Sequence, residues 1–501
     1  MKNKTGVCRV LLLVGMGLMI PCYLFTAGNT LLSPWPLYDR NRLALCLLTP
    51  LCLLLLLLLG RAAKAKVFET HERAVLLGFA AFYFIIQLFM ASALRFTPVT
   101  DLEQCVTAAR RLAQTGAFGD SERSLIYFGR YPHNMGLVYL LAGIFKAADA
   151  LGADELMAAA LVCGLLFSMG LLCAARLCRR LGGAQAQARA LLLFATCLPF
   201  LYCTSELYTD AFSVAFAPMI VFAFLKARDA GSRKERSLWA LLFAVCTFFG
   251  AQIRFPTIIA AIACLIAALF EKRAKLTALL AAPLALVFAV GGSAVNAANK
   301  ANLGAANIAQ NKLPKLHYIA MGLPVQSDEG YGQYGYGGWL IFSTSFDDPQ
   351  ARDEALRQEV VDRAYTLARH PAQLLSTLSR KNLSTFGRGT FNLNEIFEAD
   401  AHEADNAVKQ AVFENGRFNR AYTHLATAMF VAQMALACIA CIQAIRRRDT
   451  RAAPLFLTLL GAFLFLSIWE TRARYFFQFM MILLCAGAMF ETPSTHAAQK
   501  A

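Results

Sequence analysis

The sequence predicts an all-α protein that crosses a membrane many times. Of its 501 residues, 58% are hydrophobic and only 16% are charged, whereas a soluble domain carries about 25% charged residues. Apolar runs recur along the chain, and at roughly 20 residues per span there is room for about twelve of them. This composition excludes a soluble enzyme. In a membrane protein the formal charge of +16 indicates which loops face the cytoplasm, because short cytoplasmic loops are rich in Lys and Arg. We expect no nucleic-acid partner.

Residues 1–73 hold the first two apolar runs and a basic loop. The first run ends near Phe25. We expect an uncleaved span there rather than a secretory signal peptide, because more spans follow and no small-residue cleavage site closes the run. The second run covers 43–60 and stops at a basic segment, and a third covers 74–94.

The segment 134–150 decides the orientation of all later spans. It is apolar but short, and it carries Lys146. If it crosses the membrane, the basic clusters near 176–180 and 226–236 face out. If it lies in the outer interface as an amphipathic helix, they face in, as the positive-inside rule requires. We therefore expect an external loop at 95–154. The remaining spans are predicted at 155–175, 186–204, 207–226, 237–253, 255–270, 277–296, 421–444, 453–470 and 475–490.

This arrangement places the charges consistently. The predicted cytoplasmic segments hold half of the Lys and Arg residues but fewer than a quarter of the acidic ones. Both termini are thus expected in the cytoplasm of a bacterial cell, and the basic loops contact anionic lipid heads. A membrane core, 74–296, and three C-terminal spans within 421–501 flank an outer region, 297–420.

The outer region has helical segments and one glycine-rich stretch. Residues 351–369 have apolar side chains at helical spacing, and Pro371 opens a second predicted helix that runs to about Thr385. Both are expected to rest on the membrane surface. The Gly/Tyr-rich stretch 330–339 is either a plain surface loop or a mobile lid.

Ionisable residues gather at the outer ends of the predicted spans, where such groups line a wet cavity or pair with each other. Asp101 follows a span and begins a helical pattern, so it is either a helix N-cap or a functional carboxylate. Asp210, beside Glu206, and Arg254 lie in two tight outer turns. The turn 469–475 carries two outward arginines, which indicates a bound anion, an internal ion pair or interface anchoring.

The order of these motifs resembles that of the family 39 glycosyltransferases of the GT-C superfamily, in the form found in Gram-positive bacteria. Relatives include the protein O-mannosyltransferases and the aminoarabinose transferase that modifies lipid A. The resemblance covers about 74–490. The motifs are Thr100-Asp101-Leu102-Glu103, Tyr127-Phe128-Gly129-Arg130-Tyr131-Pro132-His133-Asn134, Leu207-Tyr208-Thr209-Asp210, Arg254-Phe255-Pro256-Thr257, and Trp469-Glu470 with Arg474-Tyr475.

The resemblance implies a GT-C-like bundle and a polyprenyl-phosphate sugar donor used at the outer face of the membrane. It also implies an acidic base in the first external loop, a position that Asp101 matches. Arg130 matches the basic residue that precedes proline in relatives and faces the lipid phosphate. Glu103 is the second catalytic candidate. Relatives carry two adjacent acids, whereas here Leu102 separates them, and helix neighbours two apart do not share a face.

Inverting sugar transfer would need a base, fixed positive charge and lipid access. Asp101 would take the acceptor proton. The leaving phosphate would meet Arg130 and Arg474 first, then Arg472 and Arg254. The other expected substrate-binding residues are Tyr131, His133, Asp210, Glu470 and Tyr475. A monophosphate donor leaves without a metal, so we expect no metal and no cofactor. The acceptor would be a cell-envelope glycan, glycolipid or protein.

Two other functions remain open from the sequence. A polysaccharide polymerase or ligase would use a diphosphate-linked donor and place key residues in a large outer loop, where Arg363, Arg369 and His370 lie. A transporter or flippase of lipid-linked sugars would need polar or broken helices at mid-membrane, commonly with an inverted repeat. No such repeat is evident in the sequence.

Overall fold

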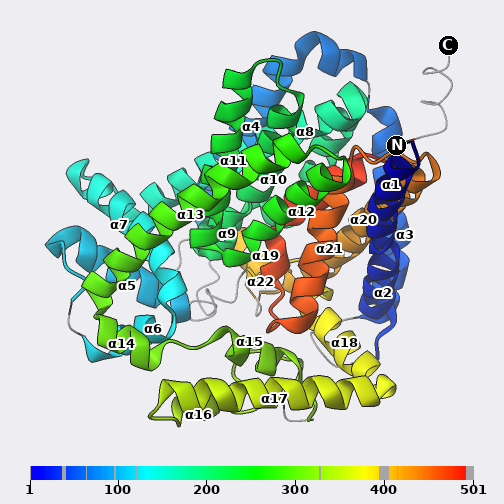
Figure 1. The fold of residues 1–501 in the computed structure, drawn as a ribbon. Coiled ribbons are helices and arrows are strands. Elements are labelled where there is room, and N and C mark those ends of the chain that lie inside the picture. Colours follow the sequence, from blue (N-terminus) through cyan, green and yellow to red (C-terminus); the bar gives the residue numbers. More distant parts are fainter. Residues whose placement is uncertain are drawn as a thin grey trace.

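The protein is described by a computed structural model that covers residues 2–35, 41–63, 65–94, 97–119, 121–326, 329–393, 406–413 and 416–491. Within these ranges the regular structure is entirely helical (Figure 1). Eight segments there are long and apolar enough to cross a membrane. This confirms an all-α protein with several membrane-crossing helices, whereas the count of twelve stays a prediction.

The eight long segments belong to a bundle that fills the upper part of Figure 1. They are α1 (Lys2–Gly17) with α2 (Met19–Leu32), α3 (Arg42–Ala62), α4 (Ala65–Leu94), α8 (Glu155–Ala195), α9 (Thr209–Ser213) with α10 (Phe216–Asp229), α11 (Arg233–Ile253), α13 (Ala274–Leu303) and α20 (Asn419–Arg446). Shorter helices complete it: α12 (Ile258–Phe270), α21 (Ala453–Ile468), α22 (Arg474–Phe477) and α23 (Met480–Ala488).

Helix α8 turns back on itself at Gly182 and Gly183, whose backbone angles are not helical. The two halves run in opposite directions along α4. Arg179 and Gln187, on either side of the turn, both bind Glu72. Gly183 has a φ of 73°, which glycine adopts without steric cost. The run predicted at 155–175 lies in the first arm of this hairpin, whereas the run predicted at 186–204 extends beyond the second arm, which ends at Ala195.

The helices outside the bundle form two groups. The first is α5 (Thr100–Thr115), α6 (Glu122–Arg130), α7 (Met135–Ala150) and α14 (Ala305–Asn311); the second is α15 (Lys315–Gly322), α16 (Trp339–Thr344), α17 (Pro349–Arg369) and α18 (Pro371–Phe386). A short helix, α19 (Ala407–Val412), precedes α20. Both helices predicted around Pro371 are confirmed. Helix α7, the segment that decided the orientation, packs on α5 and α8 and is not among the segments that qualify as spans.

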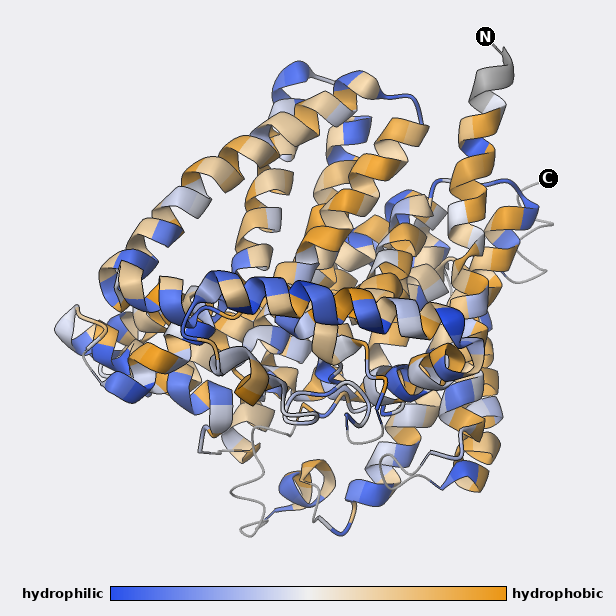
Figure 2. Cartoon of the chain, turned by 60° about the horizontal axis from the view of Figure 1, so that its bottom comes forward, coloured by the Kyte–Doolittle hydropathy of each residue, from blue (hydrophilic) through white to orange (hydrophobic). Residues whose placement is uncertain are grey.

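The bundle and the helices beneath it in Figure 1 differ in hydropathy (Figure 2). Hydrophobic residues predominate along the bundle helices, whereas α17 is mostly hydrophilic. A small second core lies under α17, where Leu356 packs with Tyr318, Met321 and Trp339. We call the segment from α15 to α18 the roof.

Several hydrogen bonds attach the roof to the bundle, among them those of Asn382 and Lys381 on α18. Asn382 on α18 donates a hydrogen bond to Thr26 of α2 at 2.8 Å. The buried ammonium of Lys381 donates to the backbone carbonyls of Gly322 and Trp469, the latter at 2.8 Å. Desolvation lowers the pKa of Lys381 to about 7, although the charge of Glu470 opposes the shift. The roof is therefore fixed in position over the end of the bundle.

Candidate functional site

One cavity of about 1020 Å³ lies where the bundle meets the roof. Its wall includes the start of α5, the length of α6, the end of α11, the end of α13 and the turn between α21 and α22. Ten of the eleven sequence-predicted site residues line it, from four separate parts of the chain: Asp101, Glu103, Arg130, Tyr131, His133, Arg254, Glu470, Arg472, Arg474 and Tyr475. The eleventh, Asp210, is completely buried beside two of these residues.

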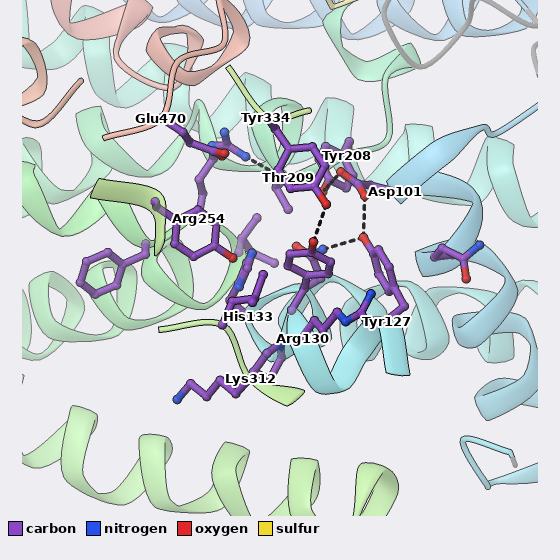
Figure 3. A pocket seen from close by; sticks show the side chains of 18 of the residues that line it. Asp101, Tyr127, Arg130, His133, Tyr208, Thr209, Arg254, Lys312, Tyr334 and Glu470 are labelled. Carbon is purple, nitrogen blue, oxygen red and sulfur yellow. Dashed lines mark hydrogen bonds between the residues drawn. The ribbon is translucent and has the colours of Figure 1, made fainter. Parts of the chain in front are cut away.

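Asp101 is the second residue of α5 and its carboxylate faces the cavity (Figure 3). Its side chain remains 43% exposed. Tyr127 donates a hydrogen bond of 2.8 Å to Oδ1, and the Tyr208 hydroxyl lies 3.5 Å from Oδ2. The N-cap position belongs to Val99, so the interpretation of Asp101 as a helix cap is wrong.

The backbone around the aspartates is strained. Thr100, directly before Asp101, has a φ of 53°, and Leu207, three residues before Asp210, has a φ of 48°. A β-branched residue in the left-handed region is a rare exception. Such conformations cost about 1–3 kcal/mol each and cluster at functional sites. Both strained residues thus lie next to side chains of the cavity.

Asp210 holds two arginines that are far apart in the sequence. Arg254 Nε lies 3.0 Å from Oδ1, and Arg474 Nε lies 3.4 Å from Oδ2. Arg254 also donates to the Thr209 hydroxyl at 2.6 Å. The Asp210 side chain is 0% exposed, and a buried carboxylate requires such partners. The two guanidiniums are therefore fixed at the cavity wall by one anion.

Arg474 connects the two aspartates, because its Nη2 lies 3.9 Å from Asp101 Oδ2. Both arginines also lie over tyrosine rings: Arg254 at 4.4 Å from the Tyr475 centroid and Arg474 at 5.4 Å from that of Tyr208. Cation–π contacts of this kind add electrostatic stabilisation and orient the guanidinium plane.

The turn between α21 and α22 is part of an internal network. Tyr475 donates a hydrogen bond to Glu470. Burial raises the pKa of Glu470, and the hydrogen bond from Tyr475 opposes that shift. Thr471 donates its amide to Gly332 at 2.8 Å, and Arg472 donates to the carbonyl of Tyr334 at 3.4 Å. Of the alternatives for this turn, the structure has ion pairs of Arg474 with Asp101 and Asp210, and the bound anion stays a prediction.

The Gly/Tyr-rich stretch contributes directly to the cavity. The hydroxyls of Tyr334 and Tyr131 lie 2.7 Å apart, which joins the stretch to the segment that follows α6. His133 also lines the cavity (Figure 3). Desolvation and the positive charge of Arg254 lower the pKa of His133 to about 4. Its imidazole is therefore neutral at pH 7 and able both to donate and to accept a hydrogen bond.

The other residues considered in the sequence lie elsewhere. Glu206 is buried and does not line the cavity. Arg363 forms an ion pair of 2.5 Å with Glu329 beneath α17 and lies over the Trp339 ring. Arg369 lies over Tyr365, and neither it nor His370 lines the cavity. The residues that would have suited a ligase loop are thus remote from this site.

Several cavity residues were not among the predicted site residues. Tyr127, Tyr208 and Lys312 line the cavity, and the sequence gives only one hint of them: the tyrosines lie inside the motifs quoted above. Among the residues that the structure describes, no cluster of three His, Cys, Asp or Glu side chains could hold a metal ion.

These features define an integral membrane protein with a cavity at one end of its helical bundle, whose charged lining residues are mostly basic. The chain belongs to the family described as "Conserved hypothetical integral membrane protein", whose profile matches residues 41–495. No curated protein and no solved structure matches the chain.

Proposed function

We propose that this protein is a glycosyltransferase that moves a sugar from a polyprenyl-phosphate donor to a cell-envelope acceptor at the outer face of a bacterial membrane. The observation that carries the proposal is the pairing of Asp101 and Arg474 across the cavity wall, 3.9 Å apart. A carboxylate with open access to the cavity lies beside fixed guanidiniums, as base-assisted attack with an anionic leaving group requires.

In this proposal Asp101 accepts the proton of the acceptor hydroxyl as that oxygen attacks the anomeric carbon. The bond between that carbon and the phosphate oxygen breaks, and configuration inverts. Arg254 meets the phosphate charge, because Arg474 is already next to the base. Arg474 and Tyr208 then form the floor under the sugar, and neutral His133 binds a sugar hydroxyl.

Asp210 is a positioning residue in the same scheme. It contacts Arg254 and Arg474 but does not line the cavity. The two guanidiniums, Asp210 and the Asp101 carboxylate are together neutral, and the cluster gains one positive charge when Asp101 takes the acceptor proton, as the phosphate leaves. A fixed cluster of this kind stabilises a leaving phosphate without reorganisation.

Lipid access is the third requirement, and the wall near Phe255 supports it. Phe255 lines the cavity and is 49% exposed. Val295 of α13 lines it as well, and only 6% of the residues in the apolar window of α13 are buried. A prenyl chain would leave the cavity between these side chains and continue along the lipid-facing surface of α13.

The full proposal includes twelve spans with both termini in the cytoplasm. The two arms of α8, the short helices α12 and α21, and the pair α22–α23 supplement the seven other long segments. The basic clusters near 176–180 and 226–236 occupy the ends of helices opposite to the cavity. The positive-inside rule then places the cavity outside.

The test is a transfer assay with purified full-length protein in nanodiscs and a panel of radiolabelled polyprenyl-phosphate sugars. We expect one donor to be consumed, and Asp101→Asn to abolish that consumption. Glu122→Gln, on the exposed side of the first external loop, is the matched carboxylate control. Equal turnover by wild type and Asp101→Asn would contradict the proposal, as would a flippase assay that reports transport without transfer.

A further inference from the structure

The charges of the cavity wall exceed what the proposed donor requires. Seven basic side chains line the cavity and three acidic ones do; Asp210 beneath the wall is a fourth acid. Three positive charges therefore remain in excess. A polyprenyl-phosphate sugar is a phosphodiester with one negative charge, so it leaves two of them unmatched.

The excess comes from basic side chains that lie apart from the acidic ones in the ion-pair network. Arg254 and Arg474 share Asp210, Arg474 also reaches Asp101, and Arg472 follows Glu470 in the same turn. The remaining basic groups are Arg123, Arg130, Lys312 and Lys315. Within the described residues none of these four forms an ion pair. We call these four residues the basic stripe.

The stripe is a structural unit. Arg123 and Arg130 both lie on α6, and seven residues apart on a helix means nearly the same face. The Leu313 amide donates to the carbonyl of Arg130 at 3.3 Å, so the chain that carries Lys312 and Lys315 lies directly beside the end of α6. Figure 3 shows Arg130 and Lys312 on the same side of His133. Arg130 Nε is shielded from solvent and has no hydrogen-bond partner.

The length of the stripe indicates its ligand. Seven residues of α-helix span about 10 Å, which is more than one phosphate or one lipid head group covers. A chain with repeating anionic groups contacts both ends at once. From this geometry we infer that the basic stripe binds an anionic polymer, and that the acceptor of the proposed reaction is a polymer of this class with repeating phosphate or carboxylate groups.

Only the statement that the polymer is the acceptor rests on the proposed function. Binding of the polymer can be measured without a donor. The probe is an end-labelled linear oligomer of glycerol phosphate, titrated with the full chain in nanodiscs of neutral lipid and followed by fluorescence anisotropy. A neutral dextran oligomer of similar length is the control ligand. We expect binding of the phosphate oligomer alone, and weaker binding as salt is added.

The double variant Lys312→Ala/Lys315→Ala should weaken oligomer binding by about tenfold or more, since two contacts to charged groups are lost. Lys146→Ala, an exposed lysine of α7 that does not line the cavity, is the matched control and should bind as wild type does. Both lysines of the double variant are exposed, so the fold should persist, which thermal melting in the same nanodiscs checks.

Three results would overturn the inference: no binding of the phosphate oligomer, equal binding by the double variant, or a stripe that responds only to anionic lipid in the nanodisc. The last would assign these residues to the membrane surface. Failure of sugar transfer with oligomer binding intact would remove the proposed function alone. Donor turnover that depends on Asp101 without oligomer binding would remove only the present inference.

Discussion

Asp101 lines the cavity and Asp210 is buried behind its wall, so the two aspartates have different surroundings. The Asp101 side chain is 43% exposed and is held by tyrosine hydroxyls, whereas Asp210 is 0% exposed and lies between two guanidiniums. The first keeps access to a ligand. The second has its charge matched within the protein. The two residues are of the same type, so burial and neighbouring charges determine that Asp101 can react with a ligand and that Asp210 positions other side chains.

The largest effect should come from the exposed member of the pair. Asp101→Asn removes the proposed base and should lower kcat by about a thousandfold, within the range for general bases. Thermal stability should stay near that of the wild type, because the side chain is partly exposed. The measurement is donor turnover together with a melting curve. Glu103→Gln should change turnover less than threefold, as a residue that no hydrogen bond connects to Asp101; a large loss there would restore a two-acid site.

Asp210→Ala tests the buried member. Removing one partner of a buried ion pair typically costs about 3–5 kcal/mol, because Arg254 and Arg474 would repel each other without it. We expect a clear drop in the melting temperature and a loss of turnover. Asp210→Asn keeps the shape and should recover part of the stability but not the rate. A melting curve unchanged by Asp210→Ala would contradict the positioning role.

Lys381 offers a pH-dependent comparison outside the cavity. Its folded pKa of about 7 lies below the value of about 10.5 in an unfolded chain. Between these values the unfolded chain binds more protons, so stability should rise with pH from about 7 to 10. The quantity to measure is the melting temperature of wild type minus that of Lys381→Met. If this difference in melting temperature does not change between pH 7 and 10, the lowered pKa of Lys381 is refuted.

The smallest effect concerns the Tyr127 hydroxyl, which donates a hydrogen bond to Asp101. Tyr127→Phe should lower turnover by about tenfold, the contribution of one hydrogen bond to a charged group. Tyr131→Phe loses its contact with Tyr334 instead and should lower turnover less. Equal losses of turnover in both variants would indicate a general loosening of the loop.

Much of the fold was predictable because apolar runs and proline positions are local signals. The helices on both sides of Pro371 and the hairpin arms of α8 follow from such patterns. The gathering of ionisable groups at the outer ends of spans also indicated the region of the cavity. The Asp210–Arg254–Arg474 cluster was not predictable, because nothing local states which arginine meets which carboxylate. The tyrosine donors to Asp101 were missed for the same reason, and Asp101 itself was open to the wrong interpretation as a cap.

The nearly uncovered helix α13 has a consequence for how the protein is handled. It contributes Val295, Asn296 and Asn299 to the cavity wall, packs against α11, and has few buried residues in its apolar window. If this exposed side faces lipid, as the proposed function requires, the thickness and lateral pressure of the bilayer help to shape the chamber. Detergent micelles of different chain length should alter ligand affinity even where they leave the melting temperature unchanged.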